Sequence, residues 1–216
     1  MIELGLKFTL AYLLGSVLGS LVVGYFRGGV DIRRLGSGNA GGTNALRTQG
    51  KAFALWVMVI DVGKGIAAVA LLAPLSLPGV GIDPDVDREL LRYALGFGAI
   101  IGHVFPVWFE FRGGKGGATA AGLLLYFAPE LAAPVLGVWV AVVVLTGFVG
   151  LATMSAGVAA ALLAAVDLPD EPGFFVFACA VAALLIFTHR GNIRRMLAGT
   201  ESRFERARVG RLLARK

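Results

Sequence analysis

Long apolar stretches separated by short polar loops constrain this chain more than any other feature. A helix that crosses the hydrocarbon core of a bilayer needs about 20 mainly apolar residues. The candidate stretches are residues 4–26, 53–77, 90–109, 131–149, 151–166 and 173–188, with a weaker one at 116–127. Only Lys7 interrupts the first of them near its start. The pattern predicts an all-α, polytopic integral membrane protein.

Composition leads to the same fold class. Residues of the set AVILMFWYC make up 57% of the 216 residues, and charged residues make up only 16%. An ordinary soluble domain is about 45–50% apolar with glycine included and about 25% charged. A soluble chain of this length has too little interior for so much apolar surface. A disordered chain, a disulfide scaffold and an ordinary soluble domain are therefore excluded, and we expect one membrane domain, 1–216.

Charges in the loops predict the orientation. Residues 27–51 carry five basic residues and one acid, Asp31, and the chain after Thr188 carries nine basic residues and two acids. The loops 83–89 and 167–171 are acidic. Because Lys and Arg mark cytoplasmic loops, we place the basic loop and the basic tail, 203–216, in the cytoplasm and the acidic loops outside. The loop containing Arg112 and Lys115 is then also cytoplasmic.

Parity of the crossings gives the number of helices. The N-terminus lies outside and the C-terminus inside, so the number of crossings is odd. The segment 116–150 is the uncertain part of this count. Three short or partly inserted helices after residue 112 give about seven transmembrane helices in total. One crossing plus a re-entrant pair is the alternative.

A segment rich in glycine and hydrogen-bond donors follows the first apolar stretch. It runs Gly-Ser-Gly-Asn-Ala-Gly-Gly-Thr-Asn-Ala-Leu-Arg over residues 36–47. Glycine allows backbone N–H groups to crowd around an anion, and a helix N-terminus adds positive potential. Arg47 ends the segment with a planar fork suited to phosphate. We expect a phosphate-binding loop, the alternative being a flexible turn between helices.

Two more polar clusters occur at predicted cytoplasmic positions. The second joins Gly-His-Val-Phe-Pro at 102–106 to Phe-Arg-Gly-Gly-Lys-Gly-Gly-Ala-Thr at 111–119, and again pairs a glycine run with a cation. The third is His-Arg-Gly-Asn-Ile-Arg-Arg at 189–195, followed by Gly-Thr-Glu at 199–201. His189 and Asn192 are three residues apart, so they share a face if the helix continues through them.

One charged pair lies inside an apolar stretch. Asp61 and Lys64 are three residues apart, and charges at such depth usually face a partner or a cavity. A structural ion pair that fixes helix packing is the favoured interpretation. A role in shaping the cytoplasmic site is the alternative.

The three clusters together resemble those of the bacterial acyl-phosphate-dependent glycerol-3-phosphate acyltransferases, the PlsY family. The family's motifs are similar to G-S-G-N-x-G-x-T-N-x-x-R, met at 36–47, and to G-H-x-F-P with F-K-G-G-K-G-x-A-T, met at 102–119 except that Arg112 stands where lysine is usual. A third motif, H-R-x-N-I-x-R with a later G-x-E, is met at 189–201. The resemblance covers the whole chain in order.

This resemblance implies an activity and a location. A fatty acyl group would pass from acyl phosphate to the 1-hydroxyl of glycerol 3-phosphate, giving lysophosphatidic acid and phosphate. We expect no cofactor, no metal, no nucleic acid, and neither acyl-CoA nor acyl carrier protein as direct donor. The protein would lie in the bacterial cytoplasmic (inner) membrane among membrane lipids, with its active site facing the cytoplasm.

The resemblance also suggests roles for individual residues. The expected catalytic residues are Ser37, Arg47, His189 and Asn192. The expected substrate-binding residues are Gly36, Gly38, Asn39, Gly41, Thr43, Asn44, His103, Gly113, Gly114, Lys115, Gly116 and Thr119. His189 is the candidate general base, and a phosphate oxygen of the acyl donor is the alternative. Which glycine loop holds which phosphate is left open, with a preference for glycerol 3-phosphate at 113–116.

Two other functions are less compatible with the sequence. A small transporter should carry ionisable or broken-helix features at the membrane midplane, often in two related halves. Here only Asp61 and Lys64 lie deep, and the chain has no internal repeat. A metal-dependent lipid transferase of the CDP-alcohol type would need several aspartates, whereas the predicted cytoplasmic loops offer only Asp31.

Overall fold

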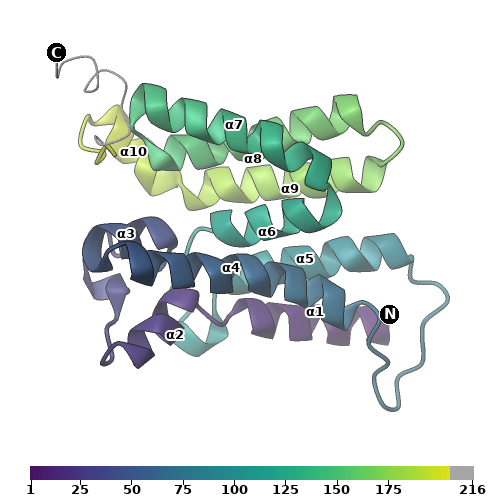
Figure 1. Ribbon diagram of the computed structural model, residues 1–216. Coiled ribbons are helices and arrows are strands. Elements are labelled where there is room, and N and C mark those ends of the chain that lie inside the picture. Colours follow the sequence, from purple (N-terminus) through teal and green to yellow (C-terminus); the bar gives the residue numbers. More distant parts are fainter. Residues whose placement is uncertain (205–216) are drawn as a thin grey trace. The chain divides into compact units, whose positions relative to one another are not determined.

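The computed structural model describes residues 1–204, and the secondary-structure elements within this range are all helices (Figure 1). Most of the predicted tail, residues 205–216, lies outside the described residues. The ten α-helices and two short 3-10 helices are α1 (Ile2–Gly15), α2 (Gly19–Phe26), η1 (Ile32–Arg34), α3 (Gly42–Gln49), α4 (Lys51–Leu72), α5 (Arg88–Val104), η2 (Val107–Phe109), α6 (Gly117–Phe127), α7 (Pro129–Thr146), α8 (Val149–Asp167), α9 (Pro172–Thr188) and α10 (Arg190–Leu197). The predicted all-α fold class is confirmed.

Several helices are long and apolar enough to cross a bilayer. Among residues 1–204, four single helices qualify: α4, α5 with η2, α7 and α8. Two bent pairs, α1 with α2 at 44° and α9 with α10 at 53°, raise the number to as many as six. Helix α6 is shorter, with 11 residues. The integral membrane character is thus confirmed, while the total of about seven helices and the orientation stay predictions.

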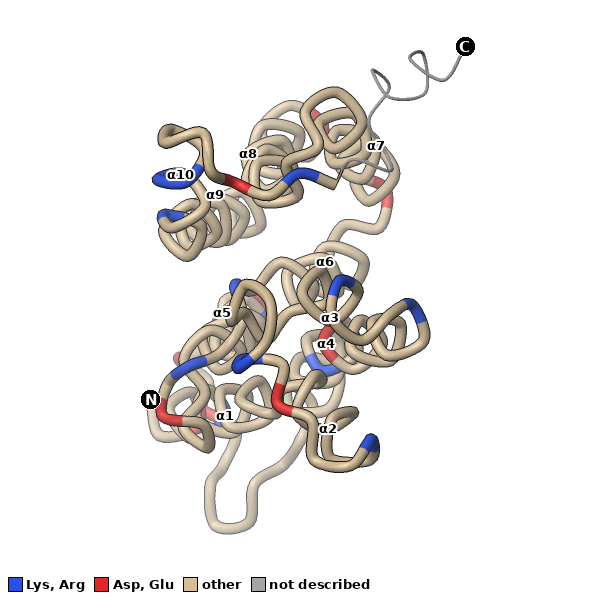
Figure 2. Tube along the Cα trace, turned by 90° about the vertical axis from the view of Figure 1, so that its left-hand side faces the viewer, with Lys and Arg blue, Asp and Glu red and all other residues tan. Residues whose placement is uncertain are grey.

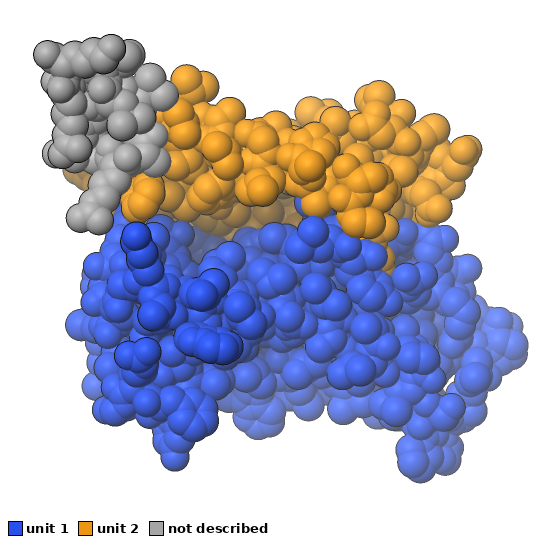
Figure 3. Space-filling view, viewed as in Figure 1, with its two compact units in different colours: residues 1–126 blue, residues 127–216 orange. Residues whose placement is uncertain are grey.

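The chain divides into two compact units, residues 1–126 and 127–216 (Figure 3). Unit 1 contains α1 to α5 and nearly all of α6, and therefore the first two polar clusters. Unit 2 contains α7 to α10 and the third cluster. The predicted single domain, 1–216, includes both units and stays a prediction.

Glycines allow the helices of unit 1 to approach closely. A Cβ on Gly15 of α1 would collide with the carbonyl of Ala99 in α5, and one on Gly102 would collide with the carbonyl of Tyr12. A Cβ on Gly65 of α4 would lie 2.9 Å from the carbonyl oxygen of Thr119 in α6. Small residues at such crossings are typical of membrane helices, which associate by close packing and interhelical hydrogen bonds.

A buried ion-pair network closes one end of unit 1 and explains why Lys7 interrupts an apolar stretch. The Lys7 ammonium lies 2.9 Å from Glu3 and donates a 2.8 Å hydrogen bond to the carbonyl of Ala73, which follows α4. Glu3 also accepts two hydrogen bonds from the guanidinium of Arg88, the first residue of α5. The network therefore joins α1, the end of α4 and the start of α5.

Unit 2 is a smaller bundle in which α8 packs against both α7 and α9. Helix α10 contacts α8 and α9. The rings of Phe127, Phe174 and Phe177 form a cluster with centroid separations of 5.3 to 6.5 Å. Aromatic packing and the α8 contacts thus hold the unit together.

Two alanine substitutions in α1 separate packing from helix propensity. Gly15→Ala should lower the thermal unfolding temperature in detergent, because its methyl group meets the backbone of α5 and overpacking costs about 1–3 kcal/mol. Gly5→Ala is the matched control, since nothing lies within 4 Å of a Cβ at that position. It should leave the temperature unchanged or raise it, and equal losses for the two variants would contradict the packing assignment.

Candidate active site

The first glycine loop of unit 1 is folded around the side chain of Asn44. This side chain is buried, and its amide nitrogen lies 2.9 Å from the carbonyl oxygens of Ile32 and Asn39 and 3.0 Å from that of Leu35. Its Oδ1 accepts a 3.0 Å hydrogen bond from the backbone N–H of Ser37. Asn44 therefore shapes the loop from within.

Two glycines of this loop adopt backbone conformations that other residues rarely accept. Gly36 has φ of +57° and Gly38 has φ of +72°. A Cβ on Gly36 would also lie 2.8 Å from the methyl group of Thr48 and collide with Asn44. The loop thus requires glycine both for its turn and for its packing against α3.

The donors predicted for catalysis and for substrate binding lie on the outside of this folded loop. Ser37 and Arg47 are exposed, and Asn39 and Thr43 are partly exposed. Helix α3 begins at Gly42 with Gly41 as its N-cap, so the positive end of a helix dipole adjoins the loop. These residues belong to one short segment and lie close together in the fold.

Arg33 connects the first glycine loop to the second. Its guanidinium forms hydrogen bonds of 2.8 to 3.2 Å with the carboxylate of Asp31. The same group lies 3.4 Å from the carbonyl oxygens of Phe109 and Arg112 and 5.5 Å from the ring centroid of Phe109. The hydrogen bond from Arg33 lowers the pKa of Asp31, and the hydrogen bond to Asp31 raises the pKa of Arg33. The pair therefore stays ionised over the neutral range.

This role of Arg33 is not evident from the sequence. There the residue is only one of the five basic residues of the loop 27–51, which predict the orientation. The signal was the sequence Asp-Ile-Arg at 31–33, in which an acid and a base two residues apart can close a local pair.

The second glycine loop folds back onto the end of α5. The N–H of Gly113 donates a 3.2 Å hydrogen bond to the carbonyl of Val104, and the N–H of Gly114 donates a 3.0 Å bond to that of His103. A Cβ on Gly113 would lie 2.8 Å from the Val104 oxygen, and one on Gly114 would collide with the His103 ring. These two amides thus bond to the helix end, so any anion cradle here depends on the residues that follow them.

The remaining predicted residues of this loop differ in exposure. Lys115 is partly exposed, and Gly116 is buried with φ of +87°. Thr119 is fully buried, and its backbone and methyl group lie against Gly65 of α4. Its position indicates a packing contact between α6 and α4.

Behind the second loop lies a buried polar cluster of Asp61, Lys64 and His103. The Lys64 ammonium is 3.0 Å from Asp61 Oδ1 and 2.8 Å from His103 Nδ1. It also donates a 2.7 Å hydrogen bond to the carbonyl of Val17, in the break between α1 and α2. Asp61 Oδ1 accepts a 3.1 Å hydrogen bond from the N–H of Gly19, the first residue of α2. The cluster therefore joins the bent span α1–α2 to α4 and α5.

In unit 2, His189 lies at the junction of α9 and α10. The helix is broken here, so the condition under which His189 and Asn192 would share a face of one continuing helix is not met. The ring nitrogen Nδ1 is 2.7 Å from the carbonyl oxygen of Leu185, which can only accept a hydrogen bond. Nδ1 therefore carries the hydrogen, and Nε2 is the basic nitrogen of the neutral ring.

Asn192, also in unit 2, is fixed by a carboxylate. Its amide nitrogen donates a 2.7 Å hydrogen bond to Glu201, whose other oxygen accepts a 2.6 Å bond from Arg195. The Asn192 side chain also lies 3.1 Å from the position of a Cβ on Gly150. Glu201 is thus a structural partner of α10.

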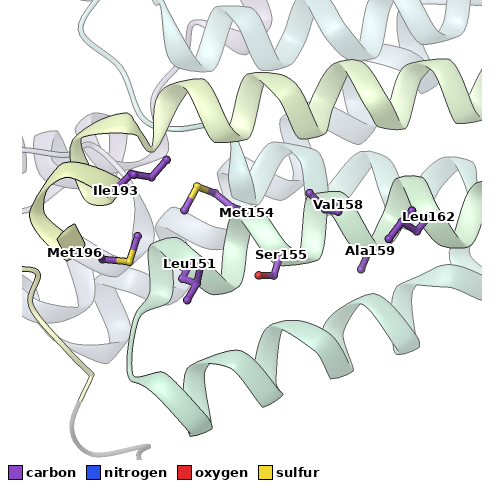
Figure 4. Close-up of a pocket in the computed structure, with 8 residues that line it drawn as sticks. All are labelled: Leu151, Met154, Ser155, Val158, Ala159, Leu162, Ile193 and Met196. Carbon is purple, nitrogen blue, oxygen red and sulfur yellow. The ribbon is translucent and has the colours of Figure 1, made fainter.

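An apolar groove of about 470 Å³ lies along α8 and α10 within unit 2 (Figure 4). Its lining residues are Leu151, Met154, Ser155, Val158, Ala159, Leu162, Ile193 and Met196. The α8 positions run from residue 151 to residue 162, about 17 Å of helix. The groove is a suitable site for an extended hydrocarbon chain.

The structure therefore brings the predicted residues together in two groups. Unit 1 gathers the loops 36–47 and 102–119, connected by Arg33, and unit 2 carries His189 and Asn192 beside the apolar groove. Each group combines basic side chains with hydrogen-bond donors on one set of loops. Such an arrangement suits a substrate with both phosphate and hydrocarbon.

Comparisons with known proteins identify the relatives of this chain. Residues 6–199 match the family described as glycerol-3-phosphate acyltransferase. The glycerol-3-phosphate acyltransferase of Chlorobaculum parvum is 41% identical, with 90% of this chain and 94% of the relative covered. That of Pelodictyon phaeoclathratiforme is 39% identical, with 89% of this chain and 93% of the relative covered.

Solved structures agree with the sequence relatives. The crystal structure of PlsY, an integral membrane glycerol 3-phosphate acyltransferase, in its glycerol 3-phosphate form is similar with a TM-score of 0.78 and 34% identity over 93% of this chain and 95% of that one. Its lysophosphatidic acid form is similar with a TM-score of 0.76 and 33% identity over 93% of this chain and 94% of that one. The chain therefore belongs to the PlsY family of integral membrane glycerol-3-phosphate acyltransferases.

Proposed function

We propose that this protein transfers a fatty acyl group from acyl phosphate to the 1-hydroxyl of glycerol 3-phosphate. The products are 1-acyl-glycerol 3-phosphate (lysophosphatidic acid) and inorganic phosphate. The observation that carries the proposal is the pair of glycine loops with Arg47 and Lys115, joined by Arg33 in one unit. Two loops with cations suit a reaction in which both substrates carry phosphate. A PlsY relative has structures in glycerol 3-phosphate and lysophosphatidic acid forms.

Acyl phosphate is a mixed anhydride, so its phosphate leaves readily. The glycerol 1-hydroxyl oxygen attacks the acyl carbonyl carbon, a new ester C–O bond forms, and the bond from that carbon to the phosphate oxygen breaks. The hydroxyl proton goes to a base, and the electron pair of the broken bond leaves with phosphate. The protein therefore contributes mainly positioning and electrostatic stabilisation.

Arg47 and Lys115 are assigned to the phosphate groups. An Arg guanidinium binds phosphate through two parallel hydrogen bonds, whereas a Lys ammonium acts as a point charge. Gly36, Gly38, Gly41 and Gly116 allow the chain to turn around the bound groups. Asn39 and Thr43 donate from the rim of the first loop, and Asn44, Gly113, Gly114 and Thr119 act by holding the two loops in shape.

Three further side chains act at the reacting atoms. His189 accepts the hydroxyl proton on Nε2, because Nδ1 is committed to the Leu185 carbonyl. Ser37 donates a hydrogen bond to phosphate or to the developing oxyanion. Asn192 does the same from an orientation fixed by Glu201. Acyl transfer is direct, without an acylated Ser37, since the donor is already activated.

The apolar groove of unit 2 is the proposed site for the acyl chain. Its lining is aliphatic apart from Ser155, and it ends at Ile193 and Met196 on the helix that carries Asn192. A groove with this lining suits the hydrocarbon tail of an amphipathic substrate. Neither acyl-CoA nor acyl carrier protein is the proposed direct donor.

We place the reaction at the cytoplasmic side of the bacterial inner membrane. Figure 2 shows Lys and Arg segments around α2 and α3 in unit 1 and on α10 in unit 2. Basic loops remain on the cytoplasmic side during membrane insertion. Water-soluble glycerol 3-phosphate and membrane-embedded acyl phosphate can both reach a site at that surface.

The donor can be tested directly with purified protein and labelled glycerol 3-phosphate. Acyl phosphate should give lysophosphatidic acid and phosphate in equal amounts, and acyl-CoA or acyl carrier protein in parallel should give none. Arg47→Ala should lose most of the turnover, while Lys51→Ala, a nearby basic residue at the start of α4, should retain it. Absence of lysophosphatidic acid from acyl phosphate would overturn the proposed function.

The base can be tested by His189→Gln, which keeps a polar side chain of similar size and removes the basic nitrogen. Turnover should fall about 10²- to 10⁴-fold, the usual contribution of a general base. Arg194→Gln, an exposed residue of the same short helix, is the control and should change turnover little. Near-normal rates for His189→Gln would assign the proton to a phosphate oxygen of the acyl donor instead.

The groove can be tested by Ala159→Phe, which fills its middle. The Michaelis constant should rise for long-chain acyl phosphates and change little for short-chain ones. Ala165→Phe is the matched control, since Ala165 lies on α8 but does not line the groove. Equal effects of both variants on all chain lengths would place the acyl chain elsewhere.

A further inference from the structure

The ammonium group of Lys64 has three partners, one for each of its protons. They are Asp61 Oδ1 at 3.0 Å, the Val17 carbonyl oxygen at 2.7 Å and His103 Nδ1 at 2.8 Å. Lys64 and Asp61 are both almost completely buried. A protonated lysine has donors only, so all three partners must act as acceptors.

This geometry fixes the tautomer of His103. Because Nδ1 accepts a hydrogen bond from Lys64, it carries no hydrogen. In a neutral imidazole the other nitrogen, Nε2, is then protonated and is a donor. The Nδ1 atom is also 3.5 Å from Asp61 Oδ1, but the shorter bond runs to the ammonium. His103 is thus set as a neutral ring with an outward N–H.

The protonated nitrogen points to the second glycine loop. A Cβ on Gly114 would collide with the His103 ring, so the ring edge lies directly against that backbone. The hydrogen bonds that residues 1–204 provide to His103 side-chain atoms all involve Nδ1. The Nε2–H faces this loop and has no acceptor among residues 1–204, so a ligand bound at the loop could supply one.

We propose that Asp61 and Lys64 are positioning residues that hold His103 in this tautomer, so that its Nε2–H donates to a phosphate oxygen of a substrate bound at the second glycine loop. The inference rests on the proposed function for the identity of the substrates. Either glycerol 3-phosphate or acyl phosphate supplies the same acceptor chemistry. His103 would touch the substrate, and the other two residues would act through it.

Helix packing alone does not require the third contact. The break between α1 and α2 releases the Val17 carbonyl and the Gly19 N–H, and Lys64 and Asp61 satisfy one each. The imidazole is not among the groups that satisfy the backbone of the helix break. The His103 contact extends the cluster from the helix break to the glycine loop.

The tautomer can be measured without turnover. The chain has two histidines, so ¹⁵N-histidine labelling of the full-length His189→Gln variant leaves a single imidazole, that of His103. NMR at neutral pH should show an unprotonated Nδ1 and a protonated Nε2. Adding glycerol 3-phosphate or inorganic phosphate should shift the Nε2 signal. A protonated Nδ1, or no response to either compound, would overturn the proposal.

Kinetics separate positioning from stability. His103→Leu should raise the Michaelis constant for one of the two substrates about 10- to 100-fold with a smaller effect on kcat, as expected for a lost hydrogen bond to phosphate. The substrate whose Michaelis constant rises is the one whose phosphate group contacts His103. His103→Gln keeps an N–H donor of similar reach and should restore most of the loss. Unchanged Michaelis constants for both substrates would contradict the proposal.

Lys64→Met should raise the same Michaelis constant, and this effect should disappear when His103→Gln is already present. Additive effects in the double variant would mean that Lys64 acts only on packing. Lys7→Met is the matched control, because Lys7 is a buried lysine paired with an acid and a backbone carbonyl but contacts no histidine. It should lower thermal stability without changing either Michaelis constant.

Wild-type protein inactive with acyl phosphate would refute the proposed function and leave the tautomer measurement valid.

Discussion

The interaction on which most of unit 1 depends is the buried pair of Asp61 and Lys64. Two charges inside a membrane helix are costly unless each has partners. Here the pair satisfies the backbone of a second helix at its break: Lys64 binds the Val17 carbonyl, and Asp61 accepts the N–H of Gly19. The bent span α1–α2 and the straight helix α4 therefore need each other. Since α1 also packs on α5 through Gly15 and Gly102, the pair fixes the helices that carry both glycine loops.

The glycines of the motifs have a physical role that differs from the one expected from the sequence. The sequence suggested that glycine admits an anion to backbone N–H groups. In the second loop, Gly113 and Gly114 instead give their N–H groups to the end of α5, and the absent Cβ makes room for backbone carbonyls and the His103 ring. In the first loop, Gly36 makes room for Asn44, which binds four backbone groups. Both loops are thus tightly packed structures in which cationic side chains are held at the surface.

The sequence predicted the helices well because apolar length and loop charge are local properties. The weak candidate at 116–127 corresponds to α6 (Gly117–Phe127), and 173–188 corresponds to α9 (Pro172–Thr188). The sequence predicts one span over the first stretch, 4–26, whereas the structure divides it at residues 16–18. No proline marks that break. The backbone groups released there are satisfied by side chains 42 and 47 residues further along the chain, so the break has no local signal. The connection that Arg33 makes to the second loop was equally hidden, since its partners Phe109 and Arg112 are distant in sequence.

The two histidines show how the same side chain is set for opposite tasks by its neighbours. At His103, a lysine ammonium occupies Nδ1 and leaves a proton on Nε2, which makes the outer nitrogen a donor. At His189, Nδ1 keeps its hydrogen and donates it in a hydrogen bond to the Leu185 carbonyl, which makes the outer nitrogen an acceptor. A donor suits the proposed contact with phosphate, and an acceptor suits the proposed removal of the hydroxyl proton. Each tautomer is selected within its own unit, by one hydrogen bond to Nδ1. The residues that make those bonds therefore belong to the chemistry as much as the imidazoles do.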